Sequence, residues 1–265
     1  MGAAIAVSPR QTGERVGALP LPLPQAGGES ATDSLNDMEL WFVRHAQPAW
    51  GVDGLTQRDP FLTDLGHQQA QLLSERLAAL ETTFTGLLVS SALRSQQTAQ
   101  PIADALSMNI ETVDDLTEIK MPDWSETPEA TVQQIFNDSY RRPPTEWWDG
   151  MEGGESFRDF HNRITTAVDD IMKSHGVTRD STDPTQLWDM GPPDERLLVV
   201  AHGGTNAVAL AYLLGAEPTP WEWERFVLGH ASVASLVAVG LGGGHILSMR
   251  TFNDREHLPE AMRTR

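Results

Sequence analysis

The sequence contains no cysteine. This absence excludes disulfide bonds, zinc sites built from thiolates and a cysteine nucleophile. No run of 18 apolar residues occurs, so we expect no membrane-spanning helix. The first ten residues also lack the basic segment followed by an apolar segment that marks a secretory signal. We therefore expect a cytoplasmic protein.

Basic residues are scarce. The 265 residues include 19 Lys and Arg against 37 Asp and Glu, which gives a formal net charge of −18. Such an acidic chain is a poor partner for nucleic acids and anionic membranes, because like charges repel. An anionic substrate would have to bind in a local basic pocket that works against the overall field.

The composition changes along the chain. Residues 1–37 are rich in Ala, Gly, Pro and Ser without helical or strand periodicity, and we expect a disordered extension there. Residues 38–256 are expected to form one domain, and residues 257–265 a C-terminal tail. Within the domain, residues 120–154 contain many helix breakers, which predicts an inserted, lid-like segment.

Short apolar segments alternate with segments of helical periodicity, and this order predicts an α/β fold. We expect a mostly parallel central sheet with helices on both faces. Thr63 and Ser156 are suited to cap two of the helices. The predicted strands are Glu39–Val43, Gly86–Ser91, Ile110–Leu116, Arg196–His202, Ser232–Val239 and His245–Thr251. Loops are expected at Ala46–Phe61 and Val177–Glu195, and a short helix near Thr131–Asn137.

Two predicted strands end in histidine. His45 follows the first strand and His202 ends the clearest buried strand. Because ligands of open α/β sheets bind beyond the carboxyl ends of the strands, both imidazoles are expected over one crevice. Arg44 and Arg94 lie at the same edge, and Gly203 begins a helix whose free N–H groups can meet an anion. Two imidazoles, two guanidinium groups and a helix N-terminus suit a phosphoryl group.

The charge of a transferring phosphoryl group suggests a role for each side chain. Neutral His45 can attack phosphorus and become a phosphohistidine. A leaving alkoxide then needs a proton, which a nearby carboxylic acid can supply. Glu118, just past the third predicted strand, is the preferred candidate. Asp115 and Asp123 remain alternatives.

Six motifs follow one another along the chain: "LWFVRHAQ", "DPFLTDLGHQQA", "SSALRSQQTA", "DLTEI", "GGESFRDF" and "VVAHGGT". In this order they resemble the histidine phosphatase (phosphoglycerate mutase-like) superfamily over about residues 39–240. The resemblance implies a phosphatase with the phosphohistidine on His45 and proton transfer by Glu118. It also implies a phosphate pocket formed by Arg44, Arg94 and His202, and it implies no metal or organic cofactor.

The sequence also departs from the family pattern. Ala46 replaces the usual glycine after the first histidine. Gln47 stands where many members carry Glu, and we assign it to phosphate binding as an amide donor. Pro48 and Gly51 replace the hydroxyl residue and the asparagine that contact phosphate in mutases, which weakens a mutase interpretation.

A pair of arginines, Arg141 and Arg142, precedes two prolines in the predicted insertion. In mutases a similar pair binds the substrate carboxylate, so both are candidate substrate contacts. A solvated charge pair is the favoured alternative, because a two-residue match is thin. The other six histidines, among them His230, carry no motif, and we expect them to serve packing or the surface.

Several functions remain open beside the phosphatase. They are phosphoglycerate mutase-type phosphoryl transfer, a catalytically inactive phosphate-binding relative, and a metal-dependent hydrolase. The last is disfavoured because Arg44 and Arg94 would repel a divalent cation. The expected partner is a small phosphorylated substrate, without nucleic acid or membrane, and a homodimer is considered.

Overall fold

The computed structural model describes residues 38–179, 187–190 and 195–265. The predicted extension 1–37 and parts of the predicted polar loop lie outside these residues. Within them, no helix is long and apolar enough to cross a membrane.

An eight-stranded sheet lies at the centre of the fold, in the order β5-β4-β8-β1-β9-β10-β7-β6. A separate two-stranded hairpin joins β2 and β3. The strands are β1 (Glu39–Arg44), β2 (Gly51–Val52), β3 (Leu55–Thr56), β4 (Gly86–Ser90), β5 (Glu111–Val113), β6 (Thr178–Arg179), β7 (Trp188–Asp189), β8 (Arg196–Ala201), β9 (Val233–Leu241) and β10 (Gly244–Asp254).

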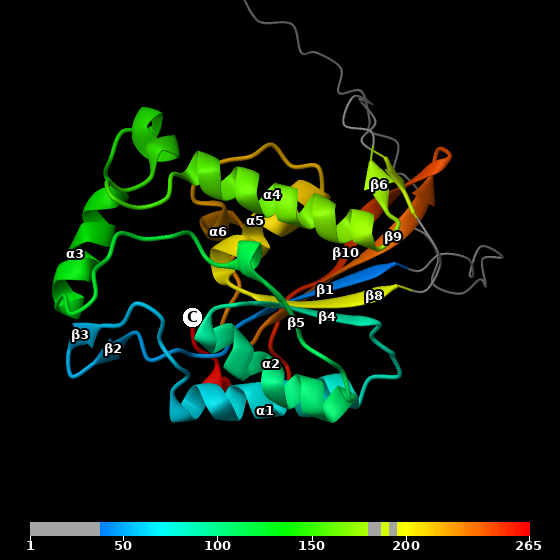
Figure 1. Cartoon of the computed structure of the whole chain (residues 1–265), viewed down its shortest axis with the longest axis horizontal. Coiled ribbons are helices and arrows are strands. Elements are labelled where there is room, and N and C mark those ends of the chain that lie inside the picture. Colours follow the sequence, from blue (N-terminus) through cyan, green and yellow to red (C-terminus); the bar gives the residue numbers. More distant parts are fainter. Residues whose placement is uncertain (1–37, 180–186, 191–194) are drawn as a thin grey trace, which may run out of the picture. The chain divides into compact units, whose positions relative to one another are not determined.

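Four neighbouring strands, β5, β4, β8 and β1, run parallel. The remaining four continue the sheet in antiparallel pairs from β9 outward. Helices lie on both faces, with α1 and α2 on one side and α4 and α5 on the other (Figure 1). The predicted α/β class is confirmed, and the antiparallel extension adds to it.

The helices begin and end close to the predicted positions. The Thr63 side chain accepts the Gly66 N–H at the start of α1, and the Ser156 side chain accepts the Asp159 N–H at the start of α4. The helix α2 continues past Pro101. The bounds are α1 (Asp64–Ala78), α2 (Leu93–Leu106), α3 (Glu129–Ser139), α4 (Phe157–Ser174), α5 (Gly203–Leu213) and α6 (Glu222–Arg225), with 3₁₀ turns at η1 (Asp114–Leu116), η2 (Pro144–Asp149) and η3 (Glu260–Met262).

Alternate residues of the central strands enter two different apolar cores. In β1, Leu40 and Phe42 join the core that contains residues of α4 and α5, whereas Val43 joins the core that contains residues of α1 and α2. In β8, Val199 and Val200 divide in the same way. Because both faces are covered, the residues of β1 and β8 other than their charged end residues are apolar.

Three local predictions were wrong. The predicted strand Ile110–Leu116 stops at Val113, since the chain turns into η1 and buries Leu116 in the core. The predicted loop Ala46–Phe61 contains the β2–β3 hairpin, whose two turn residues have φ of 53° and 78°, as an Asp-Gly turn favours. The predicted polar loop Val177–Glu195 includes β6 and β7 and buries Trp188.

The Thr63 cap links helix α1 to the loop after β1, because the Thr63 hydroxyl also donates to Gln47 Oε1 at 2.8 Å. We expect Thr63→Ala to lower the free energy of unfolding by about 1 kcal/mol, the usual cost of losing such a cap. Chemical denaturation of this variant against Thr63→Ser measures the difference. Equal stability of both variants would contradict the assigned role of the hydroxyl.

Candidate active site

The register of two parallel strands brings the two motif histidines together. Arg44 of β1 lies opposite Ala201 of β8, so the next residues, His45 and His202, leave the sheet side by side. The His45 N–H donates to the Ala201 carbonyl at 2.8 Å. The imidazole centroids are 5.1 Å apart and both side chains are buried. The predicted meeting of residues from distant parts of the sequence is therefore present in the structure.

The hydrogen bond of His45 leaves one ring nitrogen free to act as a nucleophile. Its Nδ1 lies 2.8 Å from the Ala46 carbonyl oxygen, which can only accept, so Nδ1 carries the proton. In the neutral ring, Nε2 then holds the lone pair. Burial lowers the pKa of His45 well below its usual value, and the positive charges of Arg94 and Arg44 lower it further. His45 is therefore neutral and suited to attack an electrophile.

Two arginines flank the histidines: Arg94 is buried and Arg44 is half-buried. Arg44 donates through Nη1 to the Leu228 carbonyl. Arg94 lies 3.5 Å from an Asp59 carboxylate oxygen, and its guanidinium lies over the Trp50 ring at 4.9 Å from the centroid. Burial lowers the pKa of Arg44 to about 10, which still leaves it charged at neutral pH. The site thus holds two cations in a desolvated place.

Several donors in this cluster have no hydrogen-bond partner among the described residues. They are Nε of Arg44, Nε of Arg94 and Nδ1 of His202, all buried. Buried donors without partners cost free energy, so such a cluster favours a ligand that accepts several hydrogen bonds. A tetrahedral oxyanion has this chemistry. The described residues hold no group of three or more acidic or histidine side chains that could bind a metal ion.

The end of β4 and the start of α5 complete this cluster of side chains. Ser90, the last residue of β4, lies with Oγ 2.8 Å from His202 Nε2. His202 is the N-cap of α5, and Gly203 is its first residue. A side chain at Gly203 would place its Cβ 3.4 Å from Arg44 Nε. The glycine therefore lets the guanidinium approach the helix N-terminus closely, where backbone N–H groups favour an anion.

Glu118 is the acid that reaches this edge of the sheet. Its Oε2 accepts the Gly204 N–H at 2.8 Å and its Oε1 accepts the Ile119 N–H at 3.0 Å. The alternatives Asp115 and Asp123 are exposed. The Asp123 carboxylate is hydrogen-bonded to Ser125, which lowers the pKa of Asp123. Of the three acids named from the sequence, only Glu118 contacts the start of α5.

Gln47 has structural partners on the side of α1. Its side-chain oxygen accepts from the Thr63 hydroxyl, and its backbone N–H donates to Gln69 Oε1 at 2.8 Å. These contacts fix the loop after His45. Its predicted role as a phosphate donor stays a prediction.

The two arginines of the predicted insertion contact their own segment. Arg141 is largely exposed and lies 3.3 Å from an Asp138 carboxylate oxygen. Arg142 lies 3.5 Å from Glu146 and donates to the Gly150 carbonyl, so it closes the turn η2. These partners agree with the solvated charge pair for Arg141 and with a local structural use of Arg142.

Reasoning from the sequence missed two side chains of the site, Ser90 and His230. His230 is buried, its ring centroid is 5.6 Å from that of His45, and its Nε2 lies 3.3 Å from Arg44 Nη2. Its Nδ1 lies 2.9 Å from the Thr264 hydroxyl. The sequence could have indicated His230 through its place just before β9, because an antiparallel strand beside β1 begins at the edge of the sheet where β1 ends.

The buried histidines make stability depend on pH. Burial lowers the pKa of His45 and His202, and it lowers that of His230 to about 3, whereas an unfolded histidine has a pKa of about 6.5. Below pH 6.5 the unfolded chain therefore binds more protons than the folded protein, and the free energy of unfolding decreases as the pH decreases. Each histidine contributes up to about 1.4 kcal/mol per pH unit.

We expect chemical denaturation to show this loss between pH 6.5 and 5, and a smaller loss in His230→Gln. A slope that is equal in both proteins would contradict the buried, neutral state of His230.

His230 also holds the guanidinium of Arg44. We expect His230→Ala to weaken inhibition by orthovanadate about tenfold, the effect of losing one hydrogen bond to a charged group. His230→Gln retains a side-chain acceptor and should lose less. Inhibition constants measured with p-nitrophenyl phosphate as substrate test this order. Unchanged vanadate inhibition in His230→Ala would show that Arg44 does not need this contact.

Comparison with known proteins shows which family this chain is similar to. The sequence profile of the histidine phosphatase superfamily (branch 1) matches residues 40–180. Phosphoserine phosphatase 1 of Hydrogenobacter thermophilus is 30% identical over 146 residues, which span 52% of this chain and 66% of that enzyme. A 2,3-bisphosphoglycerate-dependent phosphoglycerate mutase of Brucella melitensis is 30% identical over 192 residues, which span 68% of this chain and 82% of the mutase.

Among solved structures, the mycobacterial glucosyl-3-phosphoglycerate phosphatase superposes with a TM-score of 0.62 at 22% identity. The match covers 83% of this chain and 100% of that one, so the two share a fold. The family inferred from the motifs and the expected class of enzyme are confirmed by these matches.

Proposed function

The chain belongs to the histidine phosphatase superfamily, and from this premise we propose that it hydrolyses a phosphomonoester of a small metabolite through a phosphohistidine on His45. One observation carries the proposal. The ring centroids of His45 and His202 are 5.1 Å apart, beside the Nε atoms of Arg44 and Arg94, which have no partner among the described residues. This arrangement supports capture of a phosphoryl group next to a neutral nucleophile.

In the first step, the lone pair on His45 Nε2 attacks phosphorus, and the bond between phosphorus and the ester oxygen breaks. Arg44, Arg94 and His202 offset the negative charge on the three non-bridging oxygens. Glu118 in its acid form gives a proton to the departing oxygen. The alcohol then leaves, and the phosphoryl group stays on His45.

In the second step, water attacks the phosphorus of the phosphohistidine. The Glu118 carboxylate takes a proton from that water, and the bond between phosphorus and nitrogen breaks. Inorganic phosphate leaves, and both His45 and Glu118 return to their starting forms. A cytoplasmic location and a homodimer remain predictions from the sequence.

Position 51 favours hydrolysis over a mutase reaction. Mutases carry an asparagine at the matching place, whereas Gly51 here lies against the Glu129 side chain. An added Cβ at Gly51 would sit 1.5 Å from Glu129 Oε1. The Glu129 carboxylate thus occupies the space beside Gly51 that a side chain at position 51 would enter.

We expect a labelled phosphomonoester to leave its phosphorus on His45 when the reaction is quenched in alkaline denaturant, in which phosphohistidine survives. The label should be absent from His45→Ala and should be released to inorganic phosphate in the native protein. Transfer of the label to a second phosphoglycerate position instead would favour the mutase. A substrate that turns over without labelling His45 would contradict the mechanism.

A further inference from the structure

Glu118 lies in a segment without regular secondary structure. The turn η1 ends at Leu116, and residues 117–128 contain no helix or strand. No ladder of backbone hydrogen bonds therefore fixes the position of Glu118. Its place must come from contacts with other parts of the fold.

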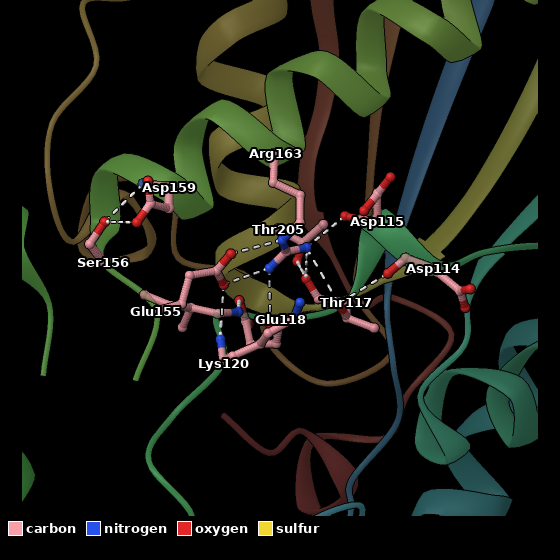
Figure 2. A network of polar contacts seen from close by, with 11 residues as sticks. Asp114, Asp115, Thr117, Glu118, Lys120, Glu155, Ser156, Asp159, Arg163 and Thr205 are labelled. Carbon is pink, nitrogen blue, oxygen red and sulfur yellow. Dashed lines mark hydrogen bonds and ion pairs between the residues drawn. The ribbon is translucent and has the colours of Figure 1, made fainter. Parts of the chain in front are cut away.

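Arg163 of α4 supplies several of these contacts. Its Nη1 donates to the Asp115 carbonyl at 2.7 Å and to the Thr117 carbonyl at 3.0 Å. Its Nη2 lies 3.4 Å from the Glu118 carbonyl oxygen. One guanidinium thus holds the backbone on the N-terminal side of Glu118 and at Glu118 itself (Figure 2).

Glu155 holds the other side of the same segment. Its carboxylate accepts the Lys120 N–H at 3.0 Å, and its own N–H donates to the Lys120 carbonyl at 2.7 Å. The same carboxylate forms a two-point ion pair with Arg163, with Nε–Oε1 at 2.9 Å and Nη2–Oε2 at 2.7 Å. Arg163 and Glu155 therefore act as one clamp on residues 115–120 (Figure 2).

Helix α5 receives the clamped segment. The Thr205 hydroxyl donates to the Thr117 carbonyl at 3.1 Å, and the Gly204 N–H donates to the Glu118 carboxylate. A Cβ at Gly204 would lie 2.4 Å from Glu118 Oε1, so the carboxylate lies close against the backbone. Small displacements of the segment would thus move the carboxylate away from the helix N-terminus.

A buried ion pair of this kind is weak evidence for stability. The side chains of Arg163 and Glu155 are 13% and 10% exposed, and two desolvated charges regain in attraction about what they lose in hydration. The positioning of Glu118 explains this ion pair better, because proton transfer needs the acid within hydrogen-bond reach of the ester oxygen. Displacements near 1 Å can cost about a hundredfold in rate.

From this geometry we propose that Arg163 and Glu155 are positioning residues that hold Glu118 where it exchanges protons with the leaving oxygen and with water. The inference rests on the proposed function of Glu118. Neither residue touches the phosphoryl group. The planar fork of Arg163 is required, since lysine has the same charge but cannot bind a carboxylate at two points and two carbonyls at once.

The test uses leaving groups of different basicity. A nitrophenolate leaves without a proton at neutral pH, whereas phenolate and especially an alkoxide need one. For Arg163→Lys we expect kcat/KM, which reports the first phosphoryl transfer, to fall tenfold or more with phenyl phosphate. It should fall less than about threefold with p-nitrophenyl phosphate, since general acid catalysis contributes little there.

Matched variants separate position from charge and from folding. Arg163→Lys keeps the positive charge that lowers the pKa of His202. Glu155→Gln keeps the shape of the side chain but weakens its hydrogen bonds to Arg163. Its kcat/KM should fall more with phenyl phosphate than with p-nitrophenyl phosphate, to a smaller degree than in Arg163→Lys. Arg158→Lys, on the exposed side of α4, should change neither substrate. Thermal unfolding of each variant establishes that the protein compared is folded.

Glu118→Gln distinguishes failure of this inference from failure of the proposed function. Its kcat/KM should also fall more with phenyl phosphate than with p-nitrophenyl phosphate. Adding Arg163→Lys to Glu118→Gln should cause little further loss of kcat/KM, because both changes impair the same proton transfer. If Glu118→Gln slows both substrates equally, Glu118 is not the acid and the proposed function is wrong on that point. If Glu118→Gln is selective but Arg163→Lys and Glu155→Gln are not, the positioning role is overturned.

Discussion

The arrangement of this protein depends on two guanidinium groups that are largely removed from water and share the nearby carboxylate of Glu118. Arg94 has Asp59 at 3.5 Å, but its Nε and that of Arg44 have no partner among the described residues. Burial keeps the neighbouring imidazoles neutral, and this concentrated positive charge adds to the effect because it opposes their protonation. The charge that binds the phosphoryl group in the proposed mechanism therefore also helps to keep His45 in the form that can attack it.

The overall charge of the chain makes this pocket more selective. A net charge of −18 repels anions near the protein surface, and salt at about 0.1 M screens this repulsion beyond about 10 Å. Only a ligand that reaches the cations of Arg44 and Arg94 gains their attraction. A small phosphorylated molecule satisfies this condition better than a polyanion, since a polyanion would leave most of its charge facing the acidic surface.

The residues at the ends of the parallel strands were predictable because the sheet itself brings them together. His45, His202 and Arg94 each follow an apolar strand, and the parallel register places such positions at one edge. His230 was not predictable in this way. It precedes an antiparallel strand, and its partner Thr264 lies in a tail that pattern reasoning left without a role. Antiparallel pairing by β9 had to be known before either residue could be assigned.

The clamp around Glu118 shows a second limit of the same kind. The motif that contains Glu155 was recognised, but Glu155 itself received no role from the sequence, because its hydrogen bond with Lys120 joins the start of α4 to a segment 35 residues earlier. Sequence periodicity reports which face of α4 is apolar, and Phe160 and Ile164 follow it. Periodicity carries no information about a buried charge beside that face.

The hairpin β2–β3 connects Arg94 to the segment that contains α3. Trp50, next to the hairpin, lies over Arg94, while the Thr56 N–H donates to the Thr127 carbonyl at 3.0 Å just before α3. The Glu129 N–H donates back to the Gly54 carbonyl at 3.1 Å. Substitutions in residues 120–154 can therefore reach Arg94 through a short chain of contacts. In the proposed mechanism Arg94 binds the phosphoryl group, so substitutions in this segment are expected to alter phosphate affinity.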